Sequence, residues 1–202
     1  MFDTRLRKWI DPLIDRLAKK LVAFGATANA ITIAGLAIGL VSAGLIATEH
    51  YLAGLIVGGI SRLCDGLDGA VARLTRKTDF GGMLDIVLDF VFYGAIPLAF
   101  VIADPGQNAM AGAVLLLAFY ANGGSVLALA LMLEKQGKAD ETARDGKALA
   151  FTEGLMEGTE TFVFFALFCL FPDFFPVLAW LFSIMTALTF LARLFRARRT
   201  LD

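Results

Sequence analysis

Residues 65–73 read DGLDGAVAR and residues 81–89 read GGMLDIVLD, and each stretch lies at one end of a long apolar segment. Each contains a pair of aspartates, Asp65 with Asp68 and Asp85 with Asp89. Spacings of three and four residues place each pair on one face of a helix. The connection between the two segments is short, so we expect antiparallel neighbouring helices whose four carboxylates converge at a similar depth.

This cluster of carboxylates predicts a metal site. Charges inside apolar spans are costly and therefore mark candidate functional sites. Four uncompensated negative charges repel strongly in a low dielectric, and bound cations would remove that repulsion. All-oxygen ligation suits Mg²⁺, Mn²⁺ or Ca²⁺. Two divalent ions would balance the charge formally, which favours a two-metal site of the kind used for phosphoryl displacement.

The composition indicates an integral membrane protein. Of the 202 residues, 58% are hydrophobic and 18% are charged, and the mean hydropathy is +0.72. A soluble domain of this length could not bury so much apolar surface. The net charge of −1 suggests no nucleic-acid partner. Cys64 and Cys169 stand in apolar segments and are interpreted as small core residues.

The predicted fold class is an all-α membrane protein with six transmembrane helices and an N-terminal amphipathic helix. Apolar runs near the length needed to cross a bilayer cover residues 28–49, 52–73, 82–103, 109–133, 155–172 and 176–195. In residues 3–24, apolar residues instead recur at intervals of three and four, and basic residues lie mostly on the other face. This pattern predicts a helix on the anionic cytoplasmic surface. The alternative is a soluble helix packed on the bundle. We expect one domain, 1–202, with the six-helix bundle at 28–195.

The basic residues predict the orientation of this bundle. All 18 Lys and Arg residues can be assigned to one side of the membrane. They precede the first span, surround the connection between the second and third spans (Arg62, Arg73, Arg76, Lys77), and occupy the connection between the fourth and fifth spans. The remaining ones lie in and after the end of the last span. Because cytoplasmic loops carry the excess of such residues, we expect both termini in the cytoplasm. A bacterial inner membrane is the expected location.

The aspartate stretches resemble the signature of the CDP-alcohol phosphotransferase family. The matching pattern is Asp65-x-x-Asp68-Gly69-x-x-Ala72-Arg73, then Gly81-x-x-x-Asp85-x-x-x-Asp89. The family usually has eight residues between the arginine and the next glycine, whereas this chain has seven if that glycine is Gly81, which leaves Gly81 or Gly82 as the motif glycine. Asn29 and Thr32 resemble a weaker Pro-Asn-x-x-Thr element, with Ala28 in place of the proline.

The resemblance implies transfer of a phosphatidyl group from CDP-diacylglycerol to a small alcohol with release of CMP, using Mg²⁺ or Mn²⁺. Asp65, Asp68 and Asp85 would ligate metal. Asp89 would ligate the second ion or act as the base on the acceptor hydroxyl. Residues that would line the nucleotide–diphosphate site are Gly69, Ala72, Arg73, Gly81, Asn29 and Thr32. The resemblance also implies a homodimer among membrane lipids.

A second acidic group bears on the acceptor alcohol. Glu153, Glu157 and Glu160 are spaced four and three residues apart and share one helix face at the start of the fifth span. They could hydrogen-bond a polyhydroxyl acceptor or attract an amino alcohol. The alternative is a solvated helix start, where glutamate favours the positive end of the dipole.

Three rival functions remain open at this point. A cation transporter would explain intramembrane acids, but it would not explain Arg73 beside them. A phosphotransferase with a different CDP-linked donor and a catalytically idle scaffold are the other two.

Overall fold

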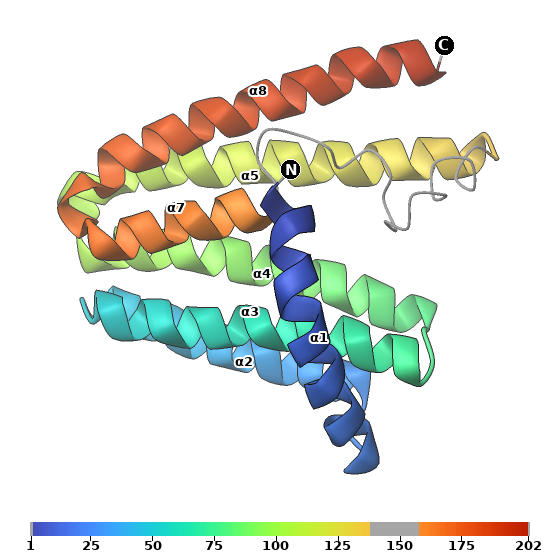
Figure 1. The fold of residues 1–202 in the computed structure, drawn as a ribbon. Coiled ribbons are helices and arrows are strands. Elements are labelled where there is room, and N and C mark those ends of the chain that lie inside the picture. The colour runs from blue at the N-terminus through green and yellow to red at the C-terminus, as the bar shows by residue number, and fades with distance from the viewer. Residues whose placement is uncertain (1, 138–157, 202) are drawn as a thin grey trace. The chain divides into compact units, whose positions relative to one another are not determined.

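The computed structural model describes residues 2–137 and 158–201, and all regular secondary structure in these ranges is helical. The elements are α1 (Phe2–Ala23), α2 (Ala28–Ala47), α3 (Tyr51–Leu74), α4 (Asp79–Ala103), α5 (Pro105–Lys135), α7 (Gly158–Leu170), the short 3-10 helix η1 (Pro172–Phe174) and α8 (Phe175–Leu201) (Figure 1). The predicted all-α class is confirmed. Helices α1 to α4 belong to one compact unit, and α8 with most of α5 and α7 belongs to a second.

Within residues 2–137 and 158–201, four helical segments are long and apolar enough to cross a membrane: α2, α4, α5 and residues 172–201. Helix α3 has a comparable length of 24 residues, but its second half carries Arg62, Asp65 and Asp68. Only 13 residues of α7 fall in the described ranges. As far as the described residues extend, each predicted span therefore coincides with an observed helix, while the count of six crossings stays a prediction.

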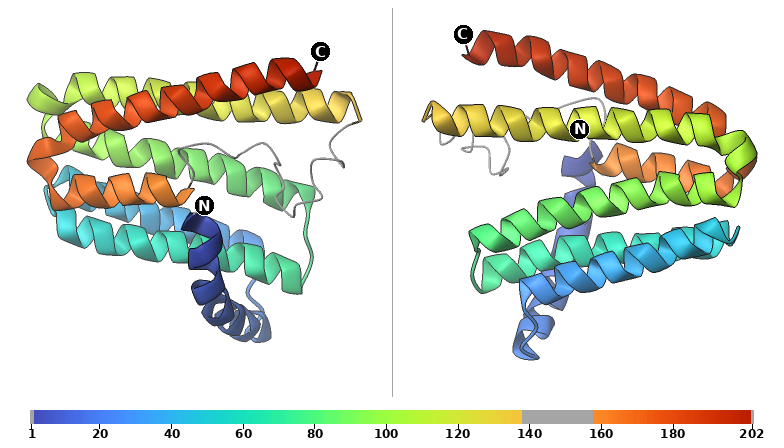
Figure 2. Two further views of the ribbon diagram at one scale, coloured as in Figure 1. Left: turned by 45° about the horizontal axis from the view of Figure 1, so that its top comes forward. Right: turned by 180° about the vertical axis from the view of Figure 1, so that it is seen from behind.

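In the first unit, α2, α3 and α4 run side by side and α1 crosses them obliquely, as two directions of view show (Figures 1 and 2). Close packing of α2 on α3 depends on small residues. Ser42 Oγ donates a 2.7 Å hydrogen bond to the Gly54 carbonyl, and Ser61 Oγ donates a 2.8 Å bond to the Gly35 carbonyl. Small and hydroxyl side chains of this kind let membrane helices approach closely. These bonds hold α3 in register on α2.

Helix α1 packs against α3. Ala18 is fully buried and forms a small apolar cluster with Ile31, Ala70 and Val71. Ile14 of α1 lies over Gly66, where an added Cβ would come within 2.9 Å of Ile14 Cδ1. The amphipathic helix predicted over 3–24 is therefore a real helix, and its apolar side includes contacts to α3.

The described part of the second unit has an aromatic core and a buried cation. Its packed rings are Phe119, Phe164, Phe165, Phe168, Phe175 and Phe182. Arg193 of α8 is only 7% exposed. Its Nη1 donates to Asn122 Oδ1 at 2.7 Å and to Ser125 Oγ at 2.6 Å, both on α5. Arg193, one of the 18 basic residues that predict the orientation of the bundle, thus joins two helices.

Candidate metal centre

Three of the four aspartates meet between α3 and α4. Asp65 on α3 and Asp85 and Asp89 on α4 each offer a carboxylate oxygen, and these oxygens all lie within 4.8 Å of one another. The helical spacing of the residues and the short connection of residues 75–78 produce this meeting. The expected convergence is therefore present for three of the four carboxylates.

Asp68 lies one helical turn beyond Asp65 and is 5% exposed. Its Oδ2 atom is buried and has no hydrogen-bond partner. Burial of a carboxylate oxygen without a partner is costly. All four aspartates line one pocket of the first unit, together with Thr32, Ser61 and Arg62. A set of carboxylate oxygens with one unsatisfied buried member fits a hard divalent cation.

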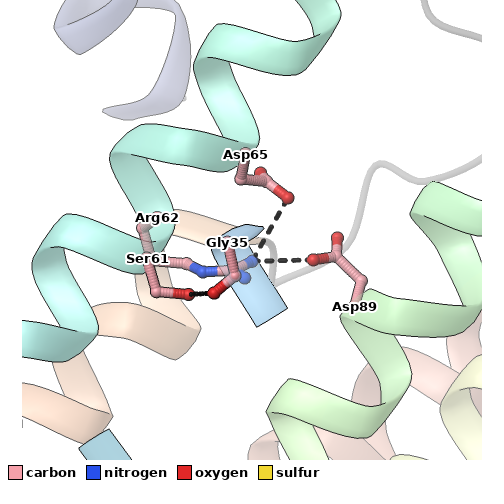
Figure 3. Close-up of polar contacts among 5 residues, drawn as sticks. All are labelled: Gly35, Ser61, Arg62, Asp65 and Asp89. Carbon is pink, nitrogen blue, oxygen red and sulfur yellow. Dashed lines mark hydrogen bonds and ion pairs between the residues drawn. The ribbon is translucent and has the colours of Figure 1, made fainter. Parts of the chain in front are cut away.

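Arg62 is a member of this site that the sequence analysis did not identify. Its Nη1 donates to Asp89 Oδ1 at 2.7 Å and approaches Asp65 Oδ1 at 3.4 Å. Figure 3 shows the guanidinium between the two carboxylates, next to the Ser61–Gly35 hydrogen bond. Arg62 lies three residues before Asp65, so it shares that helix face. This spacing was the available signal, but Arg62 was used only for orientation.

The N-termini of α2 and α4 meet beside the pocket. Thr78 caps α4, since its Oγ1 accepts a 3.0 Å hydrogen bond from the Gly81 amide. A Cβ at Gly81 would stand 2.9 Å from Thr78 Oγ1 and 3.0 Å from Asn29 Oδ1, whereas one at Gly82 would meet nothing within 4 Å. Gly81 is therefore the glycine whose missing side chain matters for packing, and Asn29 is its neighbour.

The other predicted site residues do not line this pocket in the described part of the chain. Arg73 is exposed in the last turn of α3, with Nη1 3.6 Å from the position of a Cβ at Gly69, and Ala72 is half-buried beside it. Glu160 lies in the first turn of α7, in the second unit. Glu153 and Glu157 lie outside the described residues. The roles of these residues stay predictions.

Comparison of the sequence with known proteins gives a consistent result. The sequence model of the family described as CDP-alcohol phosphatidyltransferase matches residues 25–194. The inner membrane protein YnjF of Escherichia coli K12 is 42% identical over 201 residues, which covers 100% of this chain and 97% of that protein. An archaetidylinositol phosphate synthase of Pyrococcus horikoshii is 37% identical over 91 residues, covering 43% of this chain and 46% of that protein.

Solved structures share the fold. A crystal structure of Mycobacterium tuberculosis phosphatidylinositol phosphate synthase with CDP-DAG bound matches with a TM-score of 0.67 at 22% identity, over 92% of this chain and 94% of that one. The same protein in complex with manganese and citrate also gives a TM-score of 0.67, over 92% and 88%.

Proposed function

The chain belongs to the CDP-alcohol phosphatidyltransferase family, and we propose that it transfers a phosphatidyl group from CDP-diacylglycerol to a small alcohol, with release of CMP. It is a multi-pass membrane protein of phospholipid biosynthesis. The observation that carries the proposal is the meeting of three carboxylates within 4.8 Å beside the buried, unpartnered Asp68 oxygen. This arrangement suits metal-assisted phosphoryl displacement.

Each aspartate has a proposed role in that reaction. Asp65, Asp68 and Asp85 would hold the divalent ions, Mg²⁺ or Mn²⁺, and Asp89 would hold the second ion or serve as base. When bound, the ions supply positive charge that offsets the diphosphate and the departing CMP. As base, Asp89 would accept the proton of the acceptor hydroxyl. The oxygen of that hydroxyl would then bond to the phosphatidyl phosphorus as the bond from the phosphorus to CMP breaks.

The donor would lie with its nucleotide beside the pocket and its acyl chains in lipid. Asn29, Thr32 and Gly81 at the meeting of α2 and α4, and Gly69, Ala72 and Arg73 at the end of α3, are proposed to line the nucleotide–diphosphate site. Support comes from Thr32, which lines the pocket, and from Asn29, which lies against Gly81. CDP-DAG bound to the Mycobacterium tuberculosis protein supports the same donor. Manganese in that protein supports a divalent ion.

The proposed topology has six crossings, with α1 on the cytoplasmic surface and both termini in the cytoplasm. The helix bounds and the one-sided basic residues support it. The name of the Escherichia coli relative supports an inner membrane. We further propose that the chain acts as one domain and assembles as a homodimer.

The acceptor is proposed to meet the acidic face formed by Glu153, Glu157 and Glu160, which favours a polyol or an amino alcohol. Two relatives are named as inositol phosphate lipid synthases, so a phosphorylated polyol is the competing acceptor. Purified protein would be incubated with CDP-diacylglycerol, Mn²⁺ and a panel of polyols, amino alcohols and inositol phosphate. Mass spectrometry of the lipids then identifies the product.

A new headgroup lipid supports the proposal and names the acceptor. No product with any alcohol contradicts it, and metal-dependent ion flux in liposomes would instead favour a transporter. The matched controls are Asp85→Asn, which should form no product, and Asp79→Asn, which changes an exposed aspartate of α4 outside the pocket and should form product normally.

A further inference from the structure

A cation belonging to the chain already lies inside the aspartate cluster. Arg62 Nη1 is 2.7 Å from Asp89 Oδ1 and 3.4 Å from Asp65 Oδ1. Its side chain is 18% exposed, so these contacts are partly shielded from water. A charge-assisted hydrogen bond of this length is a strong one. Arg62 therefore already neutralises part of the charge that makes the cluster attractive to metal ions.

Packing holds the guanidinium in this position. Its Cζ atom lies over the ring of Phe92, 3.9 Å from the ring centroid, which is a favourable cation–π distance. Phe92 is 1% exposed and is seated against Gly39, where a Cβ would come within 2.5 Å of Phe92 Cδ2. Arg62 is thus enclosed between an immobilised ring and two carboxylates, unlike a mobile surface cation.

We propose that Arg62 is a built-in counter-cation that competes with divalent metal ions for the Asp89 carboxylate. This inference rests on the metal site proposed above. An ion ligated by Asp89 would bind its carboxylate at about 2 Å. Such an ion would approach the guanidinium that donates to the same carboxylate, and like charges at that separation repel strongly in a low dielectric. The positive charge of Arg62 therefore opposes metal binding at Asp89 for as long as the guanidinium stays in place.

The role of Arg62 has two measurable consequences. Without metal, Arg62 limits repulsion among the aspartates and stabilises the junction of α3 with α4. With metal, the same charge lowers the affinity of the site. A residue that merely supported Asp89 as a ligand would have the opposite effect on affinity, because its removal would weaken metal binding.

The test uses the full-length protein in detergent, with Mn²⁺ binding measured by titration calorimetry. We expect Arg62→Gln to bind Mn²⁺ at least about tenfold more tightly than wild type, a change of about 1.4 kcal/mol. Arg62→Lys keeps the charge and should stay within about threefold of wild type. Arg76→Gln removes an exposed cation near the end of α3 and is the matched control for net charge. It should also stay within about threefold.

Thermal unfolding gives the second measurement. Without metal, Arg62→Gln should unfold at a lower temperature than wild type. Addition of Mn²⁺ should raise the unfolding temperature of this variant more than that of wild type. If this variant folds only with Mn²⁺, the inference is supported; if it folds neither with nor without Mn²⁺, Arg62 is a structural residue and the inference is wrong. Unchanged or weaker Mn²⁺ binding by the folded variant also overturns it. A wild-type protein that binds no Mn²⁺ overturns the proposed metal site itself, which separates the two failures.

Discussion

Gly39 of α2 faces the ring of Phe92 of α4 so closely that a Cβ at Gly39 would stand 2.5 Å from Phe92 Cδ2. The same Cβ would stand 2.9 Å from Ser61 Oγ of α3. Three helices therefore meet at a position where there is no room for a side chain. Phe92 also lies under the Arg62 guanidinium, so the packing at Gly39 supports a residue that contacts the aspartate cluster.

Gly39→Ala should destabilise the protein. The methyl group has to displace a buried ring, and overpacking of this kind costs about 1–3 kcal/mol. Gly44→Ala on the same helix is the matched control, since a Cβ there meets nothing within 4 Å. Thermal unfolding in detergent should show a lower midpoint for Gly39→Ala alone. Equal midpoints for the two variants would contradict the packing account.

Gly81→Ala should lower the rate of CMP release about tenfold, the equivalent of about 1.4 kcal/mol in the barrier. The added Cβ would push against Asn29 Oδ1 and the capping hydroxyl of Thr78, both within 3.0 Å. Gly82→Ala meets no neighbour within 4 Å and should keep a nearly normal rate. If Gly82→Ala is the slower variant, Gly82 is the motif glycine.

Asp89→Asn should keep metal binding better than activity. Asparagine retains an oxygen that can approach a cation but has lost the basicity needed to take a proton, and loss of a general base typically costs about 10²–10⁴ in rate. The measurement pairs Mn²⁺ titration with the rate of CMP release. Asp68→Asn is the comparison, because we expect it to lower both the Mn²⁺ affinity and the rate of CMP release. Equal loss of affinity and rate in Asp89→Asn would contradict its assignment as base.

Asn122→Ala should destabilise the second unit. It removes the side-chain oxygen that accepts a 2.7 Å hydrogen bond from the buried Arg193 guanidinium. A hydrogen bond to a charged group contributes about 1.5–3 kcal/mol. Tyr120→Phe, on the same helix but 81% exposed, should leave the thermal unfolding midpoint nearly unchanged. A midpoint for Asn122→Ala as high as that of Tyr120→Phe would show that the network is not stabilising.

The meeting of the aspartates could be predicted from the sequence because it depends on helical periodicity and a short connection. Asp65 with Asp68 and Asp85 with Asp89 must each share a face, and antiparallel neighbours bring the faces together. The all-α class followed equally from the apolar runs. These features depend on local spacing, and local spacing is what a sequence displays directly.

Arg62 and Arg193 could not be placed in the same way. Both were assigned from their charge to the cytoplasmic side, yet each points into its own unit and binds specific acceptors. Whether a long cationic side chain extends to the interface or turns inward depends on the partners that packing offers it. For Arg62, the spacing of three residues to Asp65 is visible in the sequence. Phe92 and Asp89, which also hold its guanidinium, are 30 and 27 positions away in the sequence.

Metal-assisted phosphatidyl transfer can be measured as the rate of CMP release from CDP-diacylglycerol by the purified protein with its acceptor alcohol. We expect release that requires both the alcohol and Mg²⁺ or Mn²⁺, is abolished by a chelator, is lost in Asp85→Asn and persists in Asp79→Asn. Release that continues without divalent ions, or an Asp85→Asn variant as active as wild type, would contradict metal-assisted transfer at the aspartate cluster.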